Sequence, residues 1–161
     1  MRNPGSAAPF GAASRTHEME EEYVTWPESL FPDKPLSAYT NREVGLEGEH
    51  YAAEYLMAMG YELIDRNWRC KYGEADLVML DDDIAVLVEV KTRVDTPEGR
   101  DVDPSSAITE AKIERYRRIS SAYITEYPAV RSARMDAVSV RLLPDKHAYL
   151  LHSVNAYNWD D

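Results

Sequence analysis

The chain has 161 residues, of which 44% are hydrophobic, so a packed core is expected and wholesale disorder is excluded. No apolar run approaches the roughly 20 residues of a membrane-spanning helix and no secretory signal is recognisable, so we expect a cytoplasmic protein with no membrane partner. The net charge of −11 argues against non-specific binding to a polyanion, and a carboxylate cluster that binds divalent cations would account for part of it.

Residues 1–40 differ in composition from the rest of the chain. They hold five of the nine prolines and an acidic run at positions 18–22, and they show no sustained hydrophobic period. This composition predicts a disordered or loosely packed tail, from which Trp26, Leu30 and Phe31 could dock on a domain. Residues 41–161 are expected to form that domain.

The domain is predicted to begin with a helix over residues 41–59. Asn41 suits the N-cap, and Gly60 ends the helix. Apolar residues at helical spacing predict one buried face. They are Val44, Ala52, Tyr55, Leu56 and Met59.

Three strands are predicted next, over residues 61–64 with 67–69, 75–80 and 84–92. The short turns between them indicate an antiparallel meander. Residues 84–92 are almost continuously apolar, which is typical of a strand at the centre of a sheet that is covered on both faces.

A polar loop at residues 93–103 precedes a second predicted helix, from about Pro104 or Ser105 to Tyr127. Strands are predicted over residues 135–143 and 148–154. A strand reached through a long helix is expected to be parallel to its neighbour, with a right-handed crossover. The predicted order is therefore α-β-β-β-α-β with one added strand, an α/β fold with a mixed central sheet flanked by helices.

Charged side chains interrupt the apolar third strand. Glu89 and Lys91 are two residues apart, so they point to the same face. Asp76 lies on the preceding antiparallel strand, where pairing can bring it beside Glu89, and Glu74 shares the face of Asp76. Ionised side chains at the centre of a sheet are unfavourable unless they are paired or bind a metal.

Two carboxylates held close together suit a hard divalent cation such as Mg²⁺ or Mn²⁺. Such an ion lowers the pKa of a bound water and offsets charge on a phosphate, while Lys91 could orient the water or stabilise the phosphorus centre. Metal-assisted phosphodiester hydrolysis is the reaction that these residues suit best. A structural ion pair between Glu89 and Lys91, or an exposed edge strand, stays open as the alternative, because Glu-x-Lys is a common tripeptide.

Four separated motifs occur in a characteristic order. They are Gly45-x-x-Gly48-Glu49-x-x-Ala52-x-x-Tyr55-Leu56-x-x-x-Gly60-Tyr61, Asp65-Arg66-Asn67-Trp68-Arg69, Gly73-Glu74-Ala75-Asp76-Leu77-Val78 and Val88-Glu89-Val90-Lys91-Thr92-Arg93. On these motifs, roughly residues 42–154 resemble the YraN family of bacterial proteins. That family is similar to the PD-(D/E)XK nuclease superfamily, close to archaeal Holliday-junction resolvases. The resemblance implies a restriction-endonuclease-like fold and does not cover the tail.

The resemblance also assigns roles to single residues. Asp76 matches the metal-binding Asp of the superfamily, and Glu89 with Lys91 matches its (D/E)-x-K motif. Glu49 matches a first-helix Glu that reaches the metal site in resolvase-like members, with a solvated helix position as the alternative. Because resolvase relatives work as dimers, the resemblance also implies a homodimer.

Basic residues near these positions are candidates for contacts with nucleic acid. Lys112, Arg115 and Arg118 recur at helical spacing on the second helix, and a stripe of this kind can contact phosphates. An ordinary solvated face with Glu/Arg pairs is the alternative. Arg66, Arg69 and Arg93 flank the predicted site and complete the candidate set.

The leading hypothesis is an Mg²⁺- or Mn²⁺-dependent endonuclease that acts on DNA, branched DNA included. The alternative is a catalytically inactive module that binds nucleic acid or protein on a nuclease-like scaffold. The four histidines show no metal-ligand spacing, and the single Cys70 excludes a zinc site of several cysteines. Arg134 and Asp136 are predicted to pair structurally.

Overall fold

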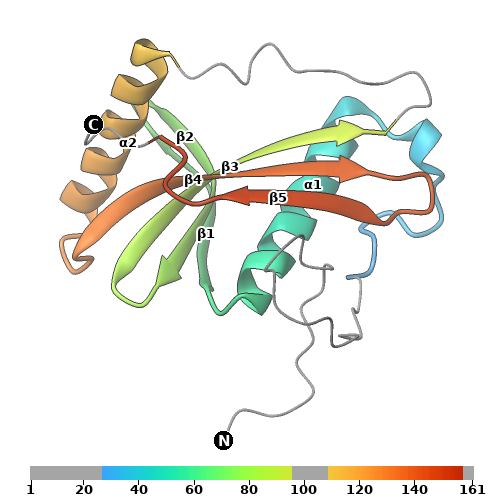
Figure 1. Ribbon diagram of the computed structural model, residues 1–161, viewed down its shortest axis with the longest axis horizontal. Coiled ribbons are helices and arrows are strands. Elements are labelled where there is room, and N and C mark those ends of the chain that lie inside the picture. Colours follow the sequence, from blue (N-terminus) through green and yellow to red (C-terminus); the bar gives the residue numbers. More distant parts are fainter. Residues whose placement is uncertain (1–26, 96–108, 158–161) are drawn as a thin grey trace, which may run out of the picture.

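The computed structural model describes residues 27–95 and 109–157. In this part of the chain, α1 and α2 lie on opposite faces of one five-stranded sheet with the order β1-β2-β3-β4-β5 (Figure 1). Strands β3 and β4 are parallel, and the other neighbouring pairs are antiparallel. The predicted α/β class, with a restriction-endonuclease-like αβββαβ core and a mixed sheet, is therefore confirmed. None of the helices described here is long and apolar enough to cross a membrane.

The elements follow the predicted order with shifted ends. Their bounds are η1 Leu36–Ala38, α1 Asn41–Ala58, β1 Glu62–Cys70, β2 Gly73–Asp81, β3 Ile84–Val94, α2 Glu110–Glu126, β4 Ser132–Leu142 and β5 Ala148–Ser153. The N-cap of α1 is Thr40 and not Asn41, because Thr40 and Glu43 form a capping box. The prediction that α2 begins at Pro104 or Ser105 is wrong, since Thr109 is extended and caps the helix through the amide of Lys112.

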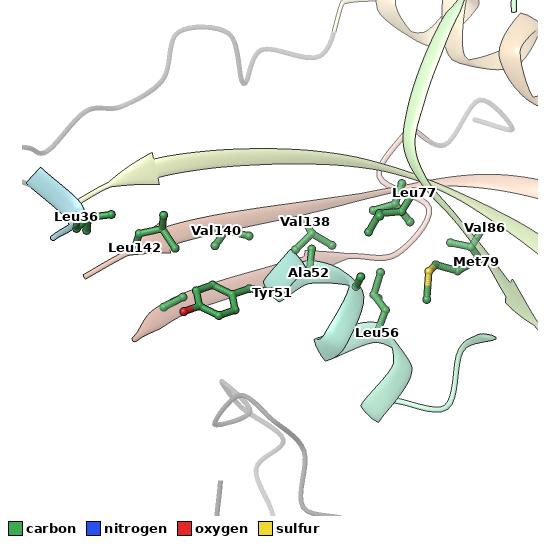
Figure 2. Packing of buried hydrophobic residues seen from close by; sticks show 13 residues of the cluster. Leu36, Tyr51, Ala52, Leu56, Leu77, Met79, Val86, Val138, Val140 and Leu142 are labelled. Carbon is green, nitrogen blue, oxygen red and sulfur yellow. The ribbon is translucent and has the colours of Figure 1, made fainter. Parts of the chain in front are cut away.

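Two hydrophobic clusters cover the two faces of the sheet. The cluster under α1 contains Tyr51, Leu56, Leu77 and Val138 (Figure 2). The cluster under α2 contains residues of the alternate strand positions, such as Leu87, together with Tyr116 and Ile119 of the helix. Strand β3 contributes to both clusters, which confirms its predicted central place.

Residues 27–40 pack on α1, although they were predicted as part of a loose tail. Leu36 is buried in the α1 cluster, and the buried carboxylate of Glu47 accepts hydrogen bonds from Ser29 Oγ at 2.9 Å and from Tyr39 Oη at 2.8 Å. Lys146 Nζ donates to two carbonyls of the same segment. These contacts explain the order of residues 27–40. Residues 1–26 of the predicted tail lie outside the described residues.

Candidate functional site at the divergence of β2 and β3

The site forms where β2 and β3 separate. Their ladder runs from Asp81 opposite Ile84 to Leu77 opposite Val88 and continues no further. The first residues of β2 turn toward α2 (Figure 1). An added Cβ on Gly73 would lie 3.0 Å from the side chain of Ile119. The divergence opens a gap in the sheet, so backbone groups of β3 need new partners at this point.

Asp76 supplies that partner. Its Oδ2 atom accepts a hydrogen bond from the amide of Val90 at 2.7 Å, in the place that a backbone carbonyl of β2 would otherwise take. Side-chain alternation also breaks here, because Ala75 and Val78 both face the α2 cluster and Leu77 faces the α1 cluster. The bond to Val90 sets the Asp76 carboxylate beside the β3 residues Glu89 and Lys91.

Glu89 lies on the α2 side of β3 with only 16% of its side chain exposed. Its Oε1 atom is 3.3 Å from Lys91 Nζ, which confirms that the two side chains share a face. Its Oε2 atom accepts a hydrogen bond of 2.5 Å from the hydroxyl of Tyr157 and lies 3.9 Å from Lys112 Nζ. Together with the hydroxyl of Tyr116, two cations and two hydroxyls therefore surround this carboxylate.

The two carboxylates have opposite electrostatic surroundings. Burial raises the pKa of Asp76, and the neighbouring carboxylates Glu74 and Glu89 raise it further, against the hydrogen bond from Val90. Burial also acts to raise the pKa of Glu89. There the hydroxyls of Tyr116 and Tyr157 and two lysines outweigh burial and hold the pKa below its usual value.

Glu49 reaches the same point from the opposite side of the sheet. Burial raises the pKa of Glu49, and the charge of Asp76 is the second cause, so the two carboxylates are close enough to repel each other. Gly48 makes this approach possible, because a Cβ there would lie 1.8 Å from Thr92 Oγ1 on β3. The close contact of α1 with β3 thus brings Glu49 to the site.

The remaining predicted residues lie at different distances from this point. Glu74 is paired with Arg69, 3.0 Å from Oε2 to Nε, and it still acts on the pKa of Asp76. Arg66 lowers the pKa of Glu49 by its charge. Lys112 pairs with Glu89 and its side chain is only 18% exposed, so it is less accessible to the phosphates of a nucleic acid than predicted.

Arg115 and Arg118 are exposed on α2, and their guanidinium groups lie beside aromatic rings of the α2 cluster. The guanidinium of Arg115 lies 5.1 Å from the ring centroid of Tyr116, and that of Arg118 lies 5.7 Å from the ring centroid of Tyr72. Arg118 also pairs with Glu114 at 2.9 Å, as the alternative of a solvated face anticipated. Arg93 is exposed on β3 beyond Lys91.

Two tyrosines at the site were not predicted from the sequence. Tyr116 and Tyr157 stack with their ring centroids 4.1 Å apart, and burial raises the pKa of Tyr116 to about 12, with Glu89 as a further cause. Their contact with Glu89 arises from α2 and from the segment after β5, far from β3 in the chain. Spacing along the sequence carries no signal for such a contact.

A divalent cation suits the donors at this point. Among residues 27–95 and 109–157, no three His, Cys, Asp or Glu side chains are grouped closely enough to hold a metal as they stand. Mg²⁺, however, usually takes one or two protein carboxylates and keeps several waters. Asp76 and Glu49 are half-buried carboxylates with raised pKa values, and a cation would relieve their mutual repulsion.

Comparisons with known proteins agree on one family. The profile described as "Uncharacterised protein family UPF0102" matches residues 48–140. A UPF0102 protein of Syntrophomonas wolfei is 40% identical over 118 residues, which cover 73% of this chain and 99% of the relative. A UPF0102 protein of Mycolicibacterium gilvum is 39% identical over 116 residues, covering 70% and 92%. One of Beutenbergia cavernae is 42% identical over 98 residues, covering 60% and 80%.

Proposed function

The chain belongs to the UPF0102 family, also called YraN, and on that premise we propose that it is a metal-dependent endonuclease acting on DNA. The resemblance of its motifs to PD-(D/E)XK nucleases and Holliday-junction resolvases supports this reading and extends it to branched DNA and to a homodimer. The fold alone would not support a nuclease activity, because one fold can carry many different activities.

The observation that carries the proposal is the hydrogen bond from the Val90 amide to Asp76. It holds a half-buried carboxylate at the opening between β2 and β3, next to Glu89 and Lys91. A purely structural role for Asp76 would leave this grouping of carboxylates unexplained, since Glu74 raises the pKa of Asp76 and Asp76 raises the pKa of Glu49. Binding of a cation accounts for that arrangement.

Asp76 and Glu89 are the proposed ligands of Mg²⁺ or Mn²⁺, with Glu49 and Glu74 in support. A bound ion supplies a Lewis acid, which offsets charge on the phosphate and lowers the pKa of a water. Lys91, 51% exposed and 3.3 Å from Glu89, would donate to that water or to a phosphate oxygen. Arg66, Arg69, Arg93, Arg115 and Arg118, with Lys112 nearest the site, are the proposed contacts of the DNA backbone.

One observation favours the alternative of a non-catalytic module that binds nucleic acid or protein. Glu89 is already neutralised by Lys91 and Lys112 and bound by Tyr157. If this pairing persists in the presence of metal, the scaffold retains its shape without a working metal site.

The test is cleavage of supercoiled plasmid and of four-way-junction DNA with Mg²⁺ or Mn²⁺. We expect cleavage by the wild type and a loss of at least about 100-fold in Asp76→Asn and Lys91→Ala, in line with the loss of a transition-state contact. Thermal unfolding with and without Mn²⁺ is measured in parallel. Mn²⁺ should raise the Tm of the wild type but not that of Asp76→Asn.

Asp82→Asn is the matched control. It makes the same substitution in the turn of the same hairpin, where the positive φ of 53° suits Asn well, and it should retain full activity. Equal cleavage by wild type and Asp76→Asn would contradict the proposal. A Tm shift with Mn²⁺ but no cleavage of either DNA would favour the non-catalytic alternative.

A further inference from the structure

Among residues 27–95 and 109–157, no helix covers one area of the sheet beside the proposed site. We call it the open face and define it by six residues: Lys91, Arg93, Ser139, Arg141, Tyr149 and Leu151. It lies on the α2 side of the sheet, because the alternate positions Val90, Val138 and Leu150 face the α1 cluster. In Figure 1, α2 lies where β3 and β4 begin, and the later halves of these strands extend beyond it.

The register arranges the open face in two rows across β3, β4 and β5. Each row takes one residue from each of β3, β4 and β5, in that order. The first row is Lys91, Ser139 and Leu151, and the second row is Arg93, Arg141 and Tyr149. Neighbouring strands lie about 4.8 Å apart, so each row forms a short, continuous strip. The rows begin directly after Glu89, which makes the open face continuous with the proposed site.

The charge of the open face is opposite to that of the whole protein. Its six positions hold three cations and no carboxylate, whereas the chain as a whole carries −11. Arg141 is exposed and has no ion-pair partner in the described part of the chain, while Lys91 is 51% exposed. On an otherwise acidic protein, such a local basic strip is a surface to which a polyanion can bind without being repelled.

The apolar part of the open face lies at its outer edge. Tyr149 is 67% exposed and Leu151 is 64% exposed on β5, the edge strand. An exposed aromatic ring beside cations is the combination that binds single-stranded nucleic acid, because a base can stack on the ring while its phosphate contacts the cation. Paired bases in a duplex cannot offer their flat faces in this way.

We propose that the open face binds a single-stranded segment of DNA, with its phosphates on Lys91, Arg93 and Arg141 and a base stacked on Tyr149. This inference rests on the proposed function and refines it. The substrates are then DNA structures in which an unpaired segment adjoins the phosphodiester to be cleaved, such as flaps and branch points.

A second copy of the chain is a weaker occupant of this face. Two-fold packing of the open face on itself would bring its three cations close to those of the partner. Like charges brought together on desolvation are unfavourable, and the face offers no carboxylate to compensate them.

The experiment measures binding of the full chain to fluorescein-labelled DNA in EDTA, where a metal-dependent enzyme does not cleave. The probes are a single strand, the duplex of the same sequence and that duplex with a single-stranded flap. We expect the single strand and the flap to bind more tightly than the duplex. Tyr149→Ala should weaken their binding by about 5- to 150-fold, and Tyr149→Phe should restore it.

Arg141→Ala should weaken the binding of the same probes and reduce the slope of log K against log salt by about 0.7. Arg131→Ala is its control, because Arg131 is also an exposed arginine, lies directly before β4 and pairs with Asp83. Equal affinity of single strand and duplex, or wild-type binding by both Tyr149→Ala and Arg141→Ala, would overturn the inference.

Cleavage assays separate this inference from the proposed function. Binding that depends on Tyr149 and Arg141, without metal-dependent cleavage, supports the open face and overturns the nuclease. Cleavage that needs Asp76, together with wild-type DNA binding by Tyr149→Ala and Arg141→Ala, supports the nuclease and overturns the inference about the open face. If Tyr149→Ala instead converts a dimer to a monomer in sedimentation and leaves DNA binding unchanged, the face is an interface between copies and the inference is wrong.

Discussion

Asp76 and Glu89 are carboxylates at one point of the sheet, yet their surroundings move their pKa values in opposite directions. Asp76 faces burial and other carboxylates, whereas Glu89 faces hydroxyls and lysines. Titratable groups whose environments separate their pKa values are typical of sites with distinct acid and base roles. In this protein, Glu89 stays ionised to a lower pH than an ordinary Glu, whereas Asp76 takes up a proton at a higher pH than an ordinary Asp.

Substitution Tyr157→Phe tests the cause of the low pKa of Glu89. The change removes the donor to Oε2, so the pKa of Glu89 should rise, and the acid limb of the rate against pH should move to higher pH. Because the pKa of Glu89 is lowered in the folded state, its contribution to stability is present above the unfolded value of about 4.3 and is lost as the pH falls through the folded pKa.

Urea unfolding of Tyr157→Phe at pH 7 should accordingly show a loss of about 1.5–3 kcal/mol, the range for a hydrogen bond to a charged group. Tyr127→Phe is the control, because Tyr127 packs against Tyr123 at the far end of α2. The dependence of its rate on pH should match that of the wild type. An unchanged acid limb in Tyr157→Phe would mean that Tyr157 does not set the ionisation of Glu89.

Alternation along two strands was enough to predict that Glu89 and Lys91 share a face and that Asp76 lies near them. It did not predict how Asp76 arrives there, because the strands diverge at residue 76 and the pairing gives way to a side-chain hydrogen bond to Val90. The contacts of Tyr116 and Tyr157 with Glu89 depend on the packing of distant segments, which no local pattern records.

Helix α1 depends on a close approach at one residue. Gly48 is buried against Thr92 of the central strand, whereas nothing lies within 4 Å of a Cβ added at Gly45 on the same helix. Two glycines three residues apart thus have different roles. Gly48 sets the distance between helix and sheet, and Gly45 occupies an open helix position.

Substitution of these glycines by alanine should give opposite results. Gly48→Ala forces α1 away from β3 and should lower the free energy of unfolding by about 1–3 kcal/mol. Gly45→Ala should raise it by roughly 0.5–1 kcal/mol, since alanine favours the helix. Urea unfolding checks both. Because α1 also carries Glu49, Gly48→Ala should weaken stabilisation by Mn²⁺, and equal stability of the two variants would contradict this account.

The strands were predicted from their apolar runs and turns, and their observed ends differ from the predicted ends by only a few residues. Helix α1 begins at Asn41 as predicted, with its cap one residue earlier, but the start of α2 was predicted less well, because Pro104 suits a helix start in isolation. Thr40 and Thr109 take the caps instead, each through a side-chain bond to the amide three residues on. Competing cap residues in one segment cannot be ranked from sequence alone.

At the scale of the whole molecule, one buried polar network joins β4 and β5 to β2 on the other side of the central strand. Asp136 is fully buried on β4 and bonds to Arg134 Nε at 3.0 Å and to His152 Nε2 on β5 at 2.8 Å. Arg134 extends the network to Asp81 on β2 and to the hydroxyl of Tyr61. The predicted pairing of Arg134 with Asp136 is confirmed, and it is part of a larger network.

Substitution Asp136→Ala should lower the free energy of unfolding by about 3–5 kcal/mol at pH 7, because Arg134 loses its buried partner. Burial acts to raise the pKa of Asp136, but His152, Arg134 and the amide of Asn155 outweigh it and hold the pKa low. This contribution is therefore present above the unfolded value of about 3.9 and is lost as the pH falls further.

The deficit of Asp136→Ala, measured by urea unfolding across pH, should shrink below pH 4. Asp145→Asn is the control, because Asp145 also pairs with a histidine but is exposed in the turn before β5. It should unfold like the wild type. A deficit that stays constant down to pH 3 would mean that the charge of Asp136 is not what stabilises the network.

The divergence of β2 and β3 also provides a built-in reporter. Within a regular ladder, the exchange of an amide proton with solvent reflects unfolding of the strands. The amide of Val90 is protected instead by one ionisable side chain, Asp76. If Asp76 binds the proposed cation, the exchange rate of this amide should follow the occupancy of the site, so that deuterium uptake at a single position of β3 measures metal binding in the intact protein.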